Sequence, residues 1–135
     1  MIKESMLFLY FNKNCQAALT MYENIFDANI LERVTYGEAK MSEKEEEKSL
    51  IMNSTFTIGG MKFCANDVLD DSIIIGNQNT IWLEFSDEQA IQNVYTKLKD
   101  NKCIVISQIE ETFWNSTYAK IKDPFGIIWE LNYQK

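Results

Sequence analysis

Apolar and polar residues in the first half of the chain follow the periods of strands and of one helix. Met6–Phe11 is short, aromatic-rich and almost wholly apolar, which is typical of a strand with both faces covered. Asn12 and Asn14 then offer helix caps, and apolar side chains recur at three- and four-residue steps up to Asp27, which predicts a helix. The predicted buried stripe of this helix consists of Ala18, Leu19, Tyr22, Ile25 and Phe26.

Three more strands are predicted before residue 70. Gly59 and Gly60 separate two of them, and a two-glycine connection lets both turn positions take a positive φ, as tight hairpins require. The stretch Gly37–Lys48 has scarcely any apolar residue and is predicted to be a mobile, solvated loop. The three strands are Ile30–Tyr36, Leu50–Ile58 and Met61–Ala65. The first half therefore reads β-α-β-β-β.

The same order of elements recurs in the second half. Thr80–Phe85 is the predicted opening strand, and Ser86 with Gln89 forms a capping box at the start of a second helix. The buried stripe of this helix is Ala90, Ile91, Val94, Tyr95 and Leu98. The remaining predicted strands are Ile104–Ile109, Tyr118–Ile121 and Ile127–Leu131. The last two flank Asp123–Gly126, whose second-position proline and fourth-position glycine favour a type I turn.

These patterns predict an α+β fold made of two β-α-β-β-β modules, approximately residues 1–70 and 77–135. Each module has one helix and about four strands, so neither alone covers both faces of its sheet, and pairing them closes a core economically. At 135 residues the chain has the common size of one domain, and we expect a single domain. An unrelated α+β domain with the same element order by chance is the alternative.

Composition and charge exclude several classes of partner. Hydrophobic residues make up 46% and charged residues 24%, as in soluble globular proteins. The formal charge of -7 repels nucleic acid phosphates and anionic membranes, and Asp100 interrupts the nearest lysine cluster, which is Lys97, Lys99 and Lys102. No stretch approaches the roughly 18 apolar residues that span a bilayer. We therefore expect no nucleic-acid partner and no membrane partner.

The cysteine and histidine contents limit the kinds of catalytic site and the cellular compartment that are expected. Cys15, Cys64 and Cys103 are odd in number and widely spaced, which argues against a disulfide framework and for the reducing cytoplasm. Met6–Phe11 is too short for the apolar core of a signal peptide. The chain has no histidine, so cysteine–histidine pairs and His-type serine triads are excluded. A nucleophilic thiol is therefore less favoured for Cys64 than a small buried side chain.

Three sequence blocks resemble one family. They are FNKNCQAALTMYENIF (Phe11–Phe26), FTIGGMKFCAND (Phe56–Asp67) and FWNSTYAKIKDPFGIIWELN (Phe113–Asn132). Together with the repeated β-α-β-β-β order, they resemble the PhnB-like branch of the vicinal oxygen chelate superfamily, which includes glyoxalase I, bleomycin-resistance proteins and extradiol dioxygenases. The resemblance implies a cupped mixed sheet of the glyoxalase/bleomycin-resistance type, a homodimer, and a small-molecule cavity between the sheets.

The resemblance also implies where a metal ion would bind. Catalytic members hold the ion with His, Glu or Gln side chains that project into the cup. The closing-strand ligand corresponds to Glu130, and the opening-strand position falls at or near Leu7. The opening-strand ligand position of the second half falls at or near Thr80. The fourth ligand position, at the end of the hairpin in the first half, falls near Cys64. Since Leu7 cannot coordinate and Thr80 is a poor ligand, we expect no metal and no other cofactor. A divalent metal at Glu130 is the alternative.

Other side chains are candidates for binding a ligand. Glu130 is a candidate catalytic base or a plain strand-end carboxylate, and Glu84 shares the facing of Thr80 by strand alternation. Glu84 therefore points into the cup or remains an exposed rim acid. Aromatic rings could line an apolar pocket; core packing is favoured for Trp82 and Trp129, while both roles stay open for Trp114. The candidate ligand-binding residues are Trp114, Glu84, Cys64, Trp82 and Leu7.

The sequence supports one leading function and two alternatives. The leading hypothesis is a non-catalytic or weakly catalytic PhnB-like protein that binds a small, partly apolar molecule without a metal. The first alternative is a metal-dependent lyase, isomerase or dioxygenase of the glyoxalase type, with an unorthodox site that includes Glu130. The second is a regulatory protein that acts by interaction alone, which predicts an exposed apolar patch and no cavity.

Overall fold

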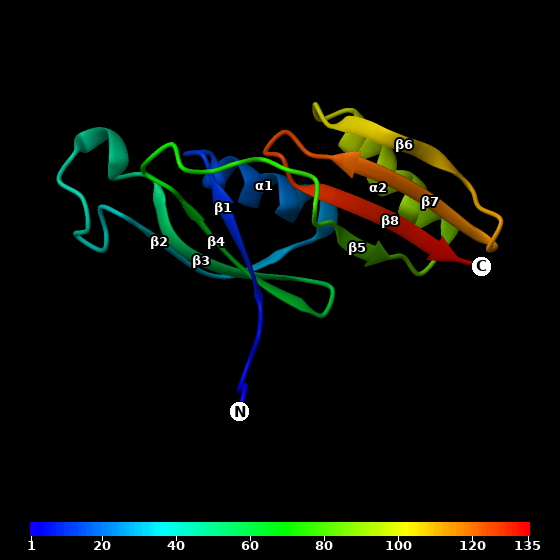
Figure 1. The fold of residues 1–135 in the computed structure, drawn as a ribbon, viewed down its shortest axis with the longest axis horizontal. Coiled ribbons are helices and arrows are strands. Elements are labelled where there is room, and N and C mark those ends of the chain that lie inside the picture. Colours follow the sequence, from blue (N-terminus) through cyan, green and yellow to red (C-terminus); the bar gives the residue numbers. More distant parts are fainter. The chain divides into compact units, whose positions relative to one another are not determined.

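The computed structural model describes residues 1–135 and divides the chain into two compact units, Met1–Ile74 and Ile75–Lys135. The first unit contains β1 (Leu7–Phe11), α1 (Cys15–Phe26), β2 (Asn29–Thr35), the short 3₁₀ helix η1 (Glu45–Glu47), β3 (Ile51–Ile58) and β4 (Met61–Asp67) (Figure 1). The second contains β5 (Ile81–Glu84), α2 (Glu88–Lys99), β6 (Ile104–Glu111), β7 (Ser116–Lys122) and β8 (Ile128–Gln134). Neither α1 nor α2 is long and apolar enough to cross a membrane.

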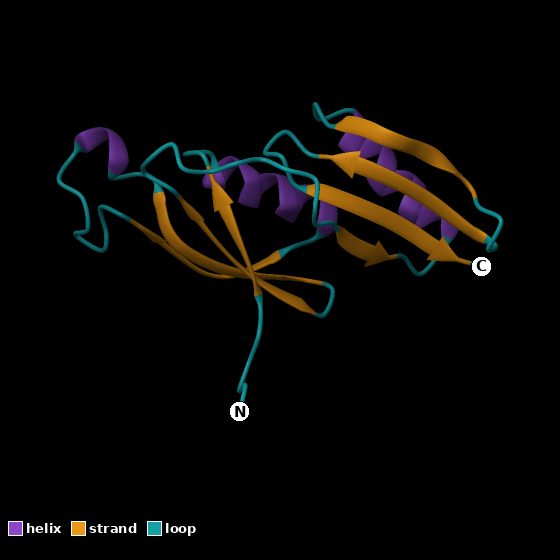
Figure 2. Ribbon diagram, viewed as in Figure 1, coloured by secondary structure: helices purple, strands orange, loops and turns teal.

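Each unit is a four-stranded mixed sheet with one α-helix, and the first unit also contains the short η1 (Figure 2). The strand order is β1-β4-β3-β2 in the first unit and β5-β8-β7-β6 in the second. The opening strand runs parallel to the closing strand in both units, and the other pairs are antiparallel. The predicted α+β class with two β-α-β-β-β modules is therefore confirmed.

The core of each unit lies between the helix and one face of the sheet. In the first unit the fully buried side chains include Phe11, Leu19, Tyr22, Phe56 and Phe63. In the second they include Ile91, Leu98, Ile121, Trp129 and Leu131. The predicted helical stripes thus supply the helix side of both cores, because residues three and four apart share one helix face.

The helix starts differ from the prediction. Asn14 makes no side-chain cap hydrogen bond at α1; the Cys15 N–H donates instead to the Asp67 carboxylate at 2.9 Å. In α2 the cap is Asp87, whose carboxylate accepts from the Ala90 N–H at 2.8 Å, and not Ser86. Asp87 has extended backbone next to the first helical residue, which is the position where a short acceptor reaches that N–H.

The connections also correct one expectation, which concerns the glycine hairpin. Only Gly59 of the glycine pair has a positive φ, at 57°, because a single left-handed residue suffices for the turn in which Ile58 pairs with Met61. The segment predicted to be a mobile loop contains η1. In the second unit the Gly126 N–H donates to the Asp123 carbonyl at 3.1 Å, the bond that a type I turn makes.

Candidate functional site

The face of the second sheet that lies opposite α2, called the open face below, gathers most of the candidate residues. Thr117 of β7 donates to Glu88 of α2 at 2.7 Å, so alternate residues of the strands face away from this helix. Two rows of cross-strand neighbours follow from the register. One row is Tyr118, Asn132 and Glu84, and the other is Lys120, Glu130 and Trp82.

Glu130 sits at the centre of a hydrogen-bond network on the open face. Thr80 Oγ1 donates to its Oε2 at 2.6 Å, and Tyr118 Oη donates to its Oε1 at 2.5 Å. Partial burial raises the pKa of the Glu130 carboxyl, but the two hydroxyl donors and the charge of Lys120 outweigh burial and lower it overall. Burial, together with the bond to Glu130, raises the pKa of Tyr118. Glu130 is therefore an ionised acceptor rather than a poised base.

Glu84 forms the second acidic group of the open face. Its Oε1 accepts from Trp82 Nε1 at 3.1 Å and from Asn132 Nδ2 at 2.9 Å, and its Oε2 accepts from the Gln134 backbone N–H at 2.8 Å. Burial alone raises the pKa of Glu84, but these donors more than offset it and lower the pKa. The side-chain oxygen of Asn132 is buried and has no hydrogen-bond partner.

Three aromatic side chains form a strip beside these carboxylates. The ring centroids of Trp82 and Tyr118 are 6.0 Å apart, and those of Trp114 and Tyr118 are 6.1 Å apart. Trp82 is 49% exposed and Trp114 is 44% exposed, so the core role favoured for Trp82 is wrong. Strand alternation gives the α2 side of β5 to Ile81 and leaves Trp82 on the open face. Trp129 is fully buried, and its predicted core role is confirmed.

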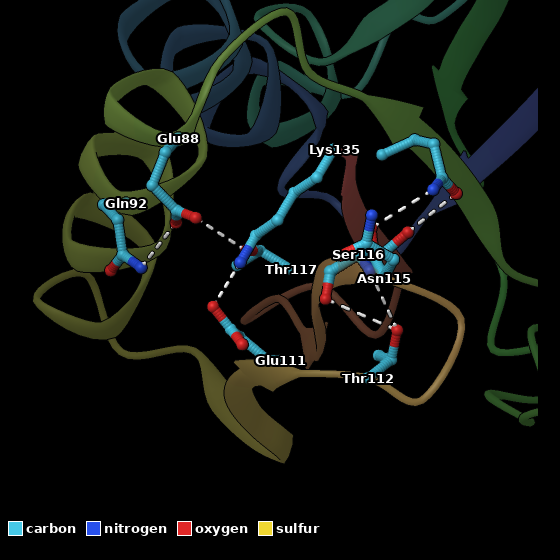
Figure 3. Close-up of polar contacts among 9 residues, drawn as sticks. Glu88, Gln92, Glu111, Thr112, Asn115, Ser116, Thr117 and Lys135 are labelled. Atoms are coloured by element: carbon cyan, nitrogen blue, oxygen red, sulfur yellow. Dashed lines mark hydrogen bonds and ion pairs between the residues drawn. The ribbon is translucent and has the colours of Figure 1, made fainter.

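The β6–β7 hairpin that carries Trp114 is tied to the end of the chain (Figure 3). Gln134 Nε2 donates to the Asn115 carbonyl at 3.1 Å, and the Lys135 backbone N–H donates to the same carbonyl at 3.1 Å. Thr112 closes the hairpin, since its N–H donates to the Ser116 carbonyl at 2.8 Å. Asn115 has a φ of 62°, a conformation that asparagine tolerates. These bonds hold the Trp114 end of the aromatic strip in place.

The first unit holds Leu7 and Cys64 on opposite faces of its sheet. Leu7 pairs with the buried Phe63 and so lies on the α1 side, whereas Phe8 pairs with Cys64. The strand residue that corresponds to Thr80 is therefore Met6, whose Sδ lies 3.1 Å from the Cys64 thiol. Cys64 is buried at 8% exposure, which fits a small buried side chain.

The residues at the positions implied for a metal do not fit one. In the second unit Thr80 and Glu130 bond to each other, and both oxygens of Glu130 already accept hydrogen bonds. In the first unit Leu7 is apolar and faces α1. No three His, Cys, Asp or Glu side chains lie together as a metal group would require.

The sequence patterns missed Asn132, and the register explains why. Strand alternation from Glu130 would have placed Asn132 on the same face, two residues along β8. Its bond to Glu84 joins residues 48 positions apart, which periodicity within one strand cannot show. Of the predicted candidates, Trp82, Trp114, Glu84 and Glu130 come together in the second unit.

Comparisons with known proteins agree with this fold. A model of the family described as the Glyoxalase/Bleomycin resistance protein/Dioxygenase superfamily matches residues 7–131. Protein YjdN of Escherichia coli (strain K12) is 22% identical over 138 residues, which cover 95% of this chain and 93% of YjdN.

Two solved structures illustrate the structural likeness. A putative 3-demethylubiquinone-9 3-methyltransferase, PhnB protein, from Bacillus cereus has a TM-score of 0.83 at 19% identity, covering 97% of this chain and 99% of that one. The fosfomycin resistance protein FosX from Listeria monocytogenes, complexed with Mn(II) and sulfate, has a TM-score of 0.68 at 16% identity, covering 100% of this chain and 93% of that one. At these identities the likeness is one of fold.

Proposed function

The chain belongs to the glyoxalase/bleomycin resistance protein/dioxygenase superfamily and is PhnB-like, and from this premise we propose that its open face binds a small, partly apolar molecule without a bound metal. One observation carries the proposal. Two tryptophan rings, Trp82 and Trp114, are about half exposed, and their centroids lie 6.0 and 6.1 Å from that of Tyr118 in the second unit. The neighbouring Glu84 and Glu130 supply polar contacts that orient a ligand.

Exposed tryptophan rings supply the driving force for such binding. Covering roughly 100 Å² of ring surface contributes about 2–3 kcal/mol from the hydrophobic effect. The rings are already positioned: Trp82 by its indole bond to Glu84, and Trp114 by the anchored hairpin. Little conformational entropy is therefore lost on binding, which favours affinity. The proposal assigns no reaction to the site.

A thermal-shift screen of metal-free protein against small aromatic and amphiphilic compounds tests this function. We expect at least one compound to raise the melting temperature, because a ligand that binds only the folded state stabilises it. The variant W82A should abolish the shift, whereas W82F, which keeps a ring and loses only the bond to Glu84, should retain most of it. A screen with no stabilising compound, or a shift that survives W82A, would remove the support for this site.

Metal content tests the metal-independent part of the proposal. Purified protein should contain well under one equivalent of nickel, zinc, iron or manganese by elemental analysis, because both oxygens of Glu130 are engaged by Thr80 and Tyr118. The variant E130A should leave the metal content unchanged. Stoichiometric metal that disappears in E130A would contradict the proposal and favour a metal-dependent enzyme of the glyoxalase type.

We also propose that the protein is a cytoplasmic homodimer. Phe8 and Tyr10 lie on the face of β1 that points away from the core, are 45% and 57% exposed, and have ring centroids 5.4 Å apart. Such exposed rings on an edge strand suit a protein interface. The three cysteines form no disulfide, which suits a reducing compartment.

Light scattering after size exclusion tests the assembly. At micromolar concentration we expect a mass twice the 15.8 kDa of one chain. Replacing Tyr10 with glutamate places a charge among the exposed rings and should shift the mass toward the monomer, since burying an unpaired charge is costly. The change Y133E, at a side chain of the second unit, serves for comparison and should leave the mass doubled. A monomeric mass for the unaltered protein would refute the dimer.

A further inference from the structure

We propose that the ligand of the open face carries a cationic, planar N–H group of the amidinium or guanidinium class next to an aromatic or apolar body. This inference rests on the proposed function and names its ligand class. The proposed position is the corner where β5 and β8 lie side by side, formed by Trp82, Glu84, Glu130 and Asn132.

The carboxylates of this corner form no direct ion pair within the protein, although Lys120 lies beside Glu130 on the neighbouring strand. The ion pairs of the chain join Lys48 to Glu45, Lys62 to Glu4 and Lys135 to Glu111. Neither Glu84 nor Glu130 has an ammonium group within the 4.0 Å that defines an ion pair. Both carboxyls have lowered pKa values and are ionised at neutral pH. The corner therefore presents two negative charges that hydrogen bonds orient and that no direct ion pair neutralises.

Asn132 gives an independent indication of a donor. The residue is 3% exposed, and its Oδ1 is buried without a hydrogen-bond partner. Its Nδ2 donates to Glu84, so turning the amide over would set its oxygen against a carboxylate. An unsatisfied buried acceptor costs about 1–3 kcal/mol, which a ligand N–H would recover. Each oxygen of Glu130 accepts one hydrogen bond and keeps a second lone pair, so the positions of the corner that remain open to a ligand are acceptors that require donors.

The aromatic ring of Trp82 offers a further favourable contact for a cation. Trp82 lies in the same row as Glu130, and its ring is 6.0 Å from that of Tyr118. A cation over an aromatic face is stabilised by about 0.5–2 kcal/mol, most strongly over tryptophan. A planar amidinium can stack on such a ring while its edge donates to a carboxylate, which a spherical ammonium cannot do.

The remaining charges of the open face lie on β6 and β7, and the nearest of them, Lys120, borders the corner at Glu130. Lys120 of β7 pairs with Glu130 across the ladder, and Glu110 of β6 pairs with Tyr118. Lys122 follows two residues along β7, next to Ile128. The lysines therefore border β8 on its β7 side, and the β5 side carries Glu84 alone. A cation is accommodated on the β5 side and an anion is disfavoured there.

Four small probes test the ligand class: benzamidinium, benzyltrimethylammonium, benzyl alcohol and benzoate. Titrations followed in ¹H–¹⁵N correlation spectra report affinity together with the Trp82 indole N–H and the Asn132 side-chain amide signals. We expect benzamidinium to bind at least tenfold more tightly than benzyl alcohol, benzoate to bind most weakly, and benzyltrimethylammonium to lie in between because it has no N–H. Benzamidinium should shift both side-chain signals.

The outcomes separate the two proposals. If benzyl alcohol or benzoate binds as tightly as benzamidinium at Trp82, the ligand class is wrong while the binding function stands. If the thermal-shift screen and all four probes fail, both are overturned. If benzyltrimethylammonium equals benzamidinium, the charge is right and the N–H requirement from Asn132 is overturned.

Variants that remove one charge locate the cation. E84Q and E130Q keep the shape of each side chain, and each should weaken benzamidinium binding about fivefold or more. The matched control D100N removes the same charge at the C-terminal end of α2, on the other side of the sheet, and should leave affinity unchanged within twofold. Equal weakening in D100N would show an effect of net charge alone and would overturn the site.

Discussion

Replacing Asp67 with alanine is expected to destabilise the first unit by about 3–5 kcal/mol. Asp67 is 1% exposed, and its two carboxylate oxygens accept from the backbone N–H groups of Cys15 and Ile51, each at 2.9 Å. Removing the carboxylate leaves both buried donors unpaired and takes away the cap of α1. Urea unfolding followed by circular dichroism measures the change.

Asp70 provides the matched control for this change. Its exposed carboxylate accepts hydrogen bonds from Ser72 in the same surface loop, so D70A should change the free energy of unfolding by no more than about 0.5 kcal/mol. An equal loss of unfolding free energy in D67A and D70A would show that the buried hydrogen bonds of Asp67 do not stabilise the unit.

Asp67 should also make the stability of the first unit depend on pH. Burial raises the pKa of the Asp67 carboxyl, and the two backbone donors offset only part of that effect. A raised pKa in the folded state means that the folded form holds the proton more tightly than the unfolded form. The stabilising contribution is therefore full below the ordinary pKa of 3.8 and is lost as the pH rises through the folded value. The advantage of the unaltered protein over D67N should shrink from acidic to neutral pH, and an advantage that grows would contradict this assignment.

Replacing Asp123 with alanine is expected to cost the second unit about 2–5 kcal/mol. Its Oδ1 accepts from the N–H groups of Phe125 and Ile127 at 2.9 and 3.0 Å, and its Oδ2 accepts from the Trp129 indole N–H at 2.9 Å. One carboxylate therefore closes the β7–β8 turn and satisfies a fully buried indole.

Two variants divide this cost between the turn and the indole. W129F keeps a ring in the core but removes the indole donor, so Asp123 retains its turn bonds. D123N keeps an acceptor for the turn and turns its amide toward the Trp129 N–H. Thermal unfolding should rank the variants with D123A least stable. A D123A protein as stable as W129F would show that the turn bonds contribute nothing.

The PhnB-like fold was predictable because it rests on periods that lie within single elements. Two local patterns indicate which faces are buried without reference to the rest of the chain: the helical stripe from Ala18 to Phe26 and the apolar run Met6–Phe11. The strand ends were predicted less well: β8 continues through Gln134 because ladder pairing to Ser116 extends beyond the apolar residues.

The candidate site depended on contacts between strands. Trp82 reads as a core residue by its size, yet α2 covers the other face of β5–β8 and leaves its ring half exposed. The family resemblance puts the opening-strand metal position at or near Leu7, whereas the residue that matches Thr80 is Met6. A shift of one residue reverses the face of the strand on which a side chain lies. Strand alternation from Glu130 gives the facing of Asn132, but its bond to Glu84 cannot be read from the sequence because Glu84 lies on another strand.

The sequence by itself determined the two modules, their element order, the buried stripes of both helices and the absence of histidine chemistry. Tertiary structure alone decided which acceptor caps α1, which rings stay exposed and how Glu84, Glu130 and Asn132 meet. The physical reason is range: periodicity acts within a few residues, whereas these contacts join residues about 50 positions apart through the register of paired strands.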